Sequence, residues 1–176
     1  MRTIILGING VLCYDNPVWN TLMPAFLRYF PSAQCVVEED TGLQLWQLRR
    51  MQRFMEMLCK KYDRPETKLI LVGHSMGGLF ASAIASRLQE AELAGVTTVC
   101  SPNSSVWMYP LYLGAARRFD APAVSFGGAR DRYVLYGTRH PRAVYHQTID
   151  CDHYESLSRN RQVAEWIASV SAKHFA

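Results

Sequence analysis

The chain has 176 residues, of which 49% are hydrophobic and 19% are charged, and its formal net charge is +4 at pH 7. This composition excludes a disordered chain and predicts one globular domain over residues 1–176. The modest charge gives no reason to expect a nucleic-acid partner. No apolar run approaches the ~18 residues that cross a bilayer, so we expect no stable membrane insertion.

The N-terminus and the cysteines bear on the compartment. Residues 1–7 run directly into an apolar strand, with too short a core and no cleavage site for a signal peptide. The five cysteines are an odd number without a disulfide framework, which indicates reduced thiols and a cytoplasmic protein. Histidine and cysteine lack zinc spacing and no phosphate-binding or dinucleotide motif is present, so we expect no metal and no cofactor.

The first half of the chain predicts two strands and two helices. The apolar run 3–8 is typical of a strand buried on both faces of a parallel sheet, and a shorter strand is expected over 34–37. Asn16 and Pro17 predict a helix start with Asn16 as the N-cap. A second helix is expected within 42–62. The predicted buried faces of these helices are Val18, Leu22, Phe26 and Tyr29, and then Leu48, Met51, Met55, Leu58 and Tyr62.

The second half continues the alternation. Further strands are predicted at 69–72, 95–100, 121–126 and 143–149, and a last helix begins near Ser156 or Ser158. Strands that alternate with helical segments predict an α/β protein with a doubly wound, mostly parallel six-stranded sheet and helices on both faces.

One motif stands out in this pattern. Residues 73–78 read Gly-His-Ser-Met-Gly-Gly, directly after the apolar strand 69–72 and before a helix rich in small residues. A serine on such a sharp strand-to-helix turn has an exposed hydroxyl. The following helix directs its N-terminal N–H groups at the same point, where a developing negative charge would be stabilised.

This motif resembles the nucleophile elbow of α/β-hydrolases, in its lipase and esterase form. The resemblance implies that Ser75 is the nucleophile. It also implies a trimmed α/β-hydrolase fold, because the serine strand is the third rather than the fifth and the family's first two strands are absent. By analogy, the strand order would be 2-1-3-4-5-6.

A serine nucleophile needs a base and an acid that orients the base. His153 follows the strand 143–149 and precedes the last helix, where the family's catalytic histidine falls. Asp131 lies in a Gly-x-x-Asp-x-x-Val segment similar to that of the family. Asp150 and Asp152 are too close to His153 in sequence to reach behind its ring easily. We expect His74, beside the nucleophile, to point elsewhere.

The oxyanion hole needs two preorganised N–H donors. The resemblance implies the backbone N–H of Met76 and a second donor, from Val11 or Gly10, in the loop after the first strand. In this loop Asn9-Gly10 stands where the family usually has His-Gly.

We place Asn9, Trp107, Met108 and Tyr154 among the substrate-binding residues. The segment between the strands 95–100 and 121–126 is too short for a lid domain. Trp107 and Met108 lie in this segment, in a stretch that is either a short apolar flap over the serine or part of the core.

The expected function is that of a carboxylic-ester hydrolase of esterase or lipase type acting on a small-molecule or lipid ester. A thioesterase or amidase on the same triad is the alternative enzyme, and a catalytically silent binding scaffold is the non-enzymatic one. Arginines 130, 132, 139 and 142 either favour an anionic substrate or phospholipid surface or form a solvated loop. The sequence does not indicate an oligomeric state.

Overall fold

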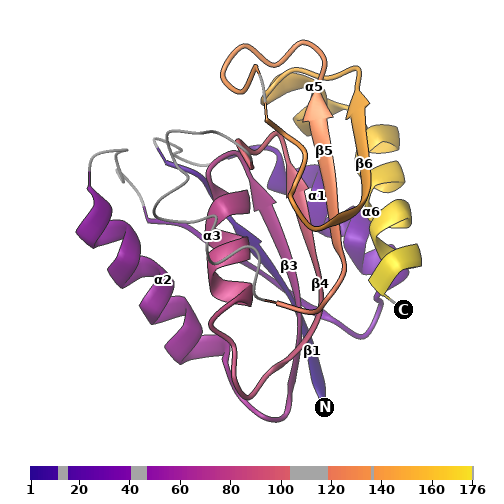
Figure 1. The fold of residues 1–176 in the computed structure, drawn as a ribbon. Coiled ribbons are helices and arrows are strands. Elements are labelled where there is room, and N and C mark those ends of the chain that lie inside the picture. Colours follow the sequence, from indigo (N-terminus) through magenta and orange to yellow (C-terminus); the bar gives the residue numbers. More distant parts are fainter. Residues whose placement is uncertain (12–15, 41–46, 104–118, 136, 176) are drawn as a thin grey trace.

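The computed structural model describes residues 1–11, 16–40, 47–103, 119–135 and 137–175 (Figure 1). The strands are β1 (Arg2–Ile8), β2 (Gln34–Glu38), β3 (Thr67–His74), β4 (Glu92–Val99), β5 (Ala123–Gly128) and β6 (Ala143–Ile149). The helices are α1 (Trp19–Tyr29), α2 (Leu48–Tyr62), α3 (Gly77–Ala85), α5 (Glu155–Arg159) and α6 (Arg161–Phe175). No helix among the described residues is long and apolar enough to cross a bilayer.

The strands form one six-stranded sheet in the order β2-β1-β3-β4-β5-β6. Every neighbouring pair is parallel. Both the fold class and the strand order predicted from the sequence are confirmed. The order reverses between β1 and β3, so connections leave these two strands toward opposite sides of the sheet. In open α/β sheets this switch point, at the carboxyl ends of the strands, is where binding sites form.

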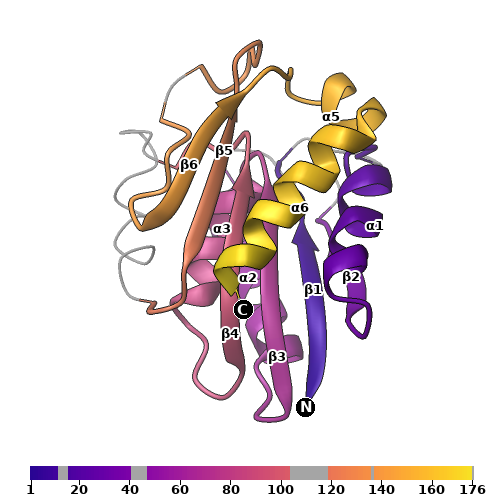
Figure 2. The same cartoon turned by 90° about the vertical axis from the view of Figure 1, so that its right-hand side faces the viewer.

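Helices cover both faces of the sheet (Figures 1 and 2). Helices α2 and α3 lie on one face, and α1, α5 and α6 lie on the other. The position of β3 inside the sheet, covered on both faces, explains why its sequence is continuously apolar. Leu69 and Leu71 pack in the first layer, whereas Ile70 and Val72 pack in the second. A strand buried on both faces needs apolar residues at every position rather than at alternate ones.

The start of α1 corrects one prediction. The helix begins at Trp19 with Val18 as its N-cap, not Asn16. The Asn16 side chain still accepts a hydrogen bond from the Val18 backbone N–H at 3.1 Å, but it lies two residues before the cap. The predicted apolar faces also extend too far, because Tyr29 is 44% exposed and Leu48 is 39% exposed. Each residue is at the end of its helix, beyond the area that the sheet covers.

Other boundaries differ in ways that packing explains. β4 begins at Glu92 because Glu92 pairs with Lys68 of β3, both in the ladder and through an ion pair of 2.9 Å. The predicted last helix is two helices, α5 and α6, separated at Asn160. The Asn160 side chain accepts the backbone N–H groups of Gln162 and Val163, and this starts α6 anew. The predicted beginning of the second helix, 42–46, lies outside the described residues.

Candidate active site

The serine motif forms a tight turn between β3 and α3. Ser75 has a backbone φ of 56°, in the left-handed region that non-glycine residues seldom adopt. The turn is held by the Ser75 N–H, which donates to the Val99 carbonyl at 3.0 Å, and by the Ser75 carbonyl, which accepts from the Gly78 N–H at 3.1 Å. Gly77 is needed for close approach, because a Cβ there would lie 1.9 Å from the Ile8 carbonyl oxygen. The predicted elbow geometry is therefore present.

The loop after β1 lies against this turn. A Cβ at Gly10 would lie 3.0 Å from the Met76 backbone nitrogen and 3.2 Å from Ser75 Oγ. Glycine keeps open a small space next to the Ser75 hydroxyl oxygen and the Met76 backbone nitrogen. Val11, the other candidate donor, is buried directly after it. The structure thus places Gly10 and Met76 next to the predicted nucleophile, with Val11 following Gly10 in the chain.

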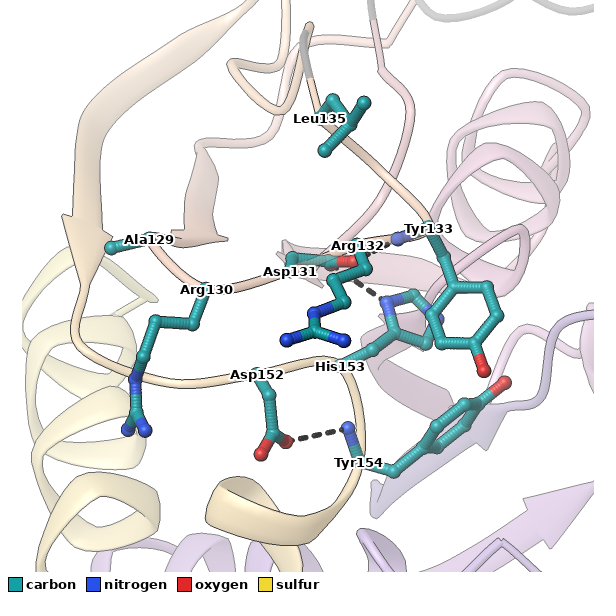
Figure 3. A pocket seen from close by; sticks show the side chains of 9 residues that line it. All are labelled: Ala129, Arg130, Asp131, Arg132, Tyr133, Leu135, Asp152, His153 and Tyr154. Atoms are coloured by element: carbon teal, nitrogen blue, oxygen red, sulfur yellow. Dashed lines mark hydrogen bonds and ion pairs between the residues drawn. The ribbon is translucent and has the colours of Figure 1, made fainter.

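His153 and Asp131 form a buried pair at the carboxyl ends of β5 and β6 (Figure 3). His153 Nδ1 lies 2.7 Å from Asp131 Oδ2, and the two side chains are 3% and 0% exposed. Asp131 follows β5 and His153 follows β6, so the parallel pairing of these strands brings their ends together. Both residues stand where the sequence interpretation expected them.

Hydrogen bonds hold the Asp131 carboxylate in its charged form. Burial alone would raise the pKa of Asp131, but hydrogen bonds from His153 and from the backbone N–H groups of Val134 and Tyr133 lower it below its usual value. Both backbone groups donate to Oδ1, at 2.9 and 2.8 Å, which leaves Oδ2 for His153. A charged carboxylate facing Nδ1 places the imidazole proton on that nitrogen and leaves Nε2 free to accept one.

His153 lies beside the serine turn, and His74 links the two. The His74 and His153 rings have centroids 4.8 Å apart, and His74 Nε2 lies 2.8 Å from the His153 carbonyl oxygen. No hydrogen bond joins Ser75 Oγ to His153 within the described part of the chain. Such bonds are commonly long before substrate binds.

The residues predicted to bind substrate have different surroundings. Asn9 is 1% exposed, and its side chain is bonded to Glu39, Asn16 and Trp19 rather than facing an open space. Tyr154 is half-buried, with its ring centroid 4.5 Å from that of His153. Trp107 and Met108 lie outside the described residues.

An open pocket of about 830 Å³ lies beside His153. Arg132, Tyr133, Leu135 and Tyr154 are among its lining residues, and the two tyrosine rings flank the imidazole (Figure 3). Tyr133 and Leu135 are 76% and 66% exposed. Charged side chains of both signs also line the pocket, among them Arg132 and Asp152, and Ser75 is not one of the described residues that border it.

The acids that were set aside have other partners. Asp150 forms an exposed ion pair with Arg130 at 2.7 Å. Asp152 accepts the Tyr154 backbone N–H at 3.1 Å. Neither side chain is hydrogen-bonded to the His153 ring, so in the described structure Asp131 alone fills that position.

Among the described residues, one group of three potential metal ligands is compact. It consists of Cys100, Asp131 and His153, whose ligand atoms lie within 4.8 Å of one another. Asp131 and His153 are already bonded to each other. A thiol must lose its proton to bind a metal, yet the hydrogen bond with Cys151 and burial raise the pKa of Cys100. In the described structure the Asp131 and His153 groups are satisfied by each other without an ion.

His74 and Asn16 were not predicted to contribute to the site. His74 was expected to point elsewhere, yet its fully buried ring contacts the backbone of His153. Asn16 was interpreted only as a helix cap, yet its amide nitrogen lies 2.9 Å from His74 Nδ1. The two residues are separated by 58 positions, and no local pattern in the sequence predicts that they meet.

No family model matches the chain, and no curated protein matches its sequence. Solved structures do match it. An esterase domain from Rhodothermus marinus superposes with a TM-score of 0.64 at 18% identity, over 98% of this chain and 88% of that one. A monoacylglycerol lipase from Paleococcus ferrophilus gives 0.60 at 12%, over 94% of each chain.

The NocB thioesterase domain, solved as a covalent complex with a fluorophosphonate nocardicin G analogue, gives a TM-score of 0.57 at 14% identity over 98% of this chain and 95% of that one. The three similar structures carry different activities on one architecture, so the likeness concerns the fold. The strand order, the elbow and these superpositions together show that the chain has the α/β-hydrolase fold, in a trimmed form with six parallel strands.

Proposed function

We propose that the protein is a serine hydrolase that cleaves carboxylic esters through an acyl-enzyme on Ser75. The observation that carries this proposal is the buried hydrogen bond of 2.7 Å between Asp131 and His153, beside a serine with a left-handed backbone. A buried carboxylate, an imidazole and a serine on a strained turn are the three parts that nucleophilic acyl transfer requires.

In the first half of the reaction, His153 Nε2 takes the proton of the Ser75 hydroxyl as Oγ attacks the ester carbonyl carbon. Asp131 remains ionised, holds the Nδ1–H tautomer and stabilises the imidazolium that forms. The low pKa of Asp131 supports this role, because the carboxylate stays charged at neutral pH. His153 then donates its proton to the departing alcohol oxygen, and the acyl group remains on Ser75.

The oxyanion of the tetrahedral intermediate would lie in the space that Gly10 leaves open. The Met76 backbone nitrogen borders this space and would supply one donor, and the loop at Gly10 and Val11 would supply the second. Preorganised backbone donors contribute most when they face the charge that develops in the transition state. The helix α3 begins at Gly77, so its N-terminal dipole adds to the same stabilisation.

In the second half, water attacks the acyl-enzyme with His153 again acting as base, and Ser75 regains its proton when the acid leaves. The open pocket beside His153 supports a small-molecule or lipid ester as substrate, because Tyr133, Leu135 and Tyr154 line it together with charged side chains, and Tyr133 and Leu135 are exposed to solvent. The single domain without a separate lid and the cytoplasmic location stay predictions.

Kinetics on three substrates with one acyl group, an oxygen ester, a thioester and an amide, test this function. We expect hydrolysis of the oxygen ester that disappears in Ser75→Ala. If Ser75 hydrolysed only the thioester or only the amide, the protein would be a thioesterase or an amidase rather than an esterase. A protein that turns over none of the three and is not labelled by a fluorophosphonate would contradict the proposal and favour a binding scaffold.

A further inference from the structure

A chain of buried hydrogen bonds runs from the loop after β1 to the carbonyl group of His153. His74 occupies its centre and is fully buried. Its Nε2 faces the His153 carbonyl oxygen at 2.8 Å, and its Nδ1 faces the Asn16 amide nitrogen at 2.9 Å.

These partners determine the state of the His74 ring. A carbonyl oxygen only accepts, so Nε2 must carry the proton and donate it. An amide NH₂ group only donates, so Nδ1 must be the accepting nitrogen. Burial first, and then the neighbouring His153, lower the pKa of His74 to about 3, in agreement with a neutral ring.

The Asn16 amide also contacts the loop after β1, which carries the proposed oxyanion donors. Asn16 Nδ2 has a second hydrogen, which it donates to Asn9 Oδ1 at 2.7 Å. Asn9 Oδ1 also accepts the indole N–H of Trp19 at 3.1 Å, and Asn9 Nδ2 donates to Glu39 at 2.9 Å. Each group in the network therefore has one possible direction of donation. Fully satisfied buried networks of this kind hold their members in one arrangement.

We infer that His74 is a positioning residue, which, through Asn16 and Asn9, holds the His153 backbone and the Gly10 loop in one fixed relation. This inference rests on the proposed hydrolase function and adds to it a residue that touches neither substrate nor the reacting atoms. The two segments that it joins carry the proposed base and the proposed oxyanion donors. They follow different strands, β6 and β1, and lie far apart in the sequence. A misplacement of ~1 Å between such groups costs about 100-fold in rate.

The test compares two replacements of His74 with a matched control. His74→Leu fills the volume but removes both hydrogen bonds, whereas His74→Gln keeps a donor and an acceptor. His140→Leu removes another buried imidazole, which bonds to Ser82 at 3.0 Å and to the Arg142 N–H at 3.1 Å, outside the network. Thermal unfolding of all three variants measures the structural cost separately from the catalytic one.

For His74→Leu we expect kcat to fall by about 100-fold with KM changed by less than about threefold, and fluorophosphonate labelling of Ser75 to slow in parallel. The proton NMR signal of His153 Nδ1–H should shift or broaden. His74→Gln should recover kcat to within about tenfold of wild type. His140→Leu should lose stability but keep kcat within about threefold.

If His74→Leu does not fold, Asn16→Asp replaces it, because it keeps the shape and the acceptor for Val18 but removes both donations. A folded His74→Leu or Asn16→Asp protein with wild-type kcat and labelling rate would overturn the inference while leaving the hydrolase intact. Equal losses in His74→Leu and His140→Leu would also overturn it. Failure of the proposed function looks different, since Ser75 of the wild-type protein would then not be labelled at all.

Discussion

Asp131 and His153 lie 22 residues apart in sequence, yet their side chains meet at 2.7 Å in a buried hydrogen bond. Each follows the carboxyl end of one of two paired parallel strands, so the sheet itself places them together. Asp131 receives two further hydrogen bonds from its own loop, which fix the carboxylate before it contacts the imidazole. The pair is therefore built by local turn geometry as well as by strand pairing.

Replacement of Asp131 by Asn should lower kcat by about 10⁴-fold, because the amide no longer holds the Nδ1–H tautomer or stabilises the imidazolium. The fold should survive, since the Asn oxygen can still accept the Tyr133 and Val134 N–H groups. The controls are Asp150→Asn and Asp152→Asn, whose carboxylates face Arg130 and a backbone N–H instead. In steady-state ester hydrolysis, the kcat of both control variants should stay within about tenfold of wild type. A loss of kcat in either control that equals the loss in Asp131→Asn would mean that the acid is misassigned.

Gly10→Ala should reduce kcat by about 10²- to 10³-fold, the usual cost of losing one oxyanion donor. The new methyl group would lie 3.0 Å from the Met76 nitrogen and 3.2 Å from Ser75 Oγ, in the space proposed for the oxyanion. Circular dichroism and thermal unfolding check that the variant is folded. A folded Gly10→Ala protein with unchanged kcat would show that the oxyanion lies elsewhere.

Two buried histidines should make the protein sensitive to acid. Burial lowers the pKa of His74 to about 3 and that of His140 to about 4, and the charge of Arg142 adds to the shift at His140. The unfolded chain therefore binds more protons than the folded one below pH ~6.5, the usual histidine pKa. The contribution of these histidines to the free energy of unfolding is fully present above that pH. It falls by about 1.4 kcal/mol per pH unit for each histidine as the pH drops toward the pKa of the folded state.

Urea unfolding at pH 7, 5.5 and 4.5 measures this slope. His140→Gln should lessen the slope by about 1.4 kcal/mol per pH unit, because it removes one of the two titrating groups. An identical slope in the variant would mean that His140 is protonated in the folded protein or does not titrate in this range.

Much of the architecture could be predicted because its causes are local. The apolar runs at β1 and β3 indicate strands buried on both faces, and parallel sheets of this type place their functional loops at one edge. The Ser75 turn is also local, since its glycines are required by contacts between adjacent elements. Element ends were less predictable, because Tyr29 and Leu48 continue a helical pattern past the point where the sheet stops covering it.

The His74 network is the clearest example of what the sequence alone does not reveal. His74 bonds to a carbonyl 79 residues away and to an amide 58 residues away, and both contacts depend on the finished sheet. The sequence around His74, beside the predicted nucleophile, does not indicate whether this side chain faces solvent or the core. Asn16 was interpreted as a helix cap because asparagine is a preferred N-cap residue and Pro17 follows it.

The most direct test of the central claim is peptide mapping by mass spectrometry after reaction with a fluorophosphonate. The account predicts a single covalent adduct on Ser75 of the wild-type protein, none in Ser75→Ala, and loss of ester hydrolysis by roughly 10⁴- to 10⁶-fold in that variant. An adduct on another residue, or wild-type turnover by a folded Ser75→Ala protein, would contradict it.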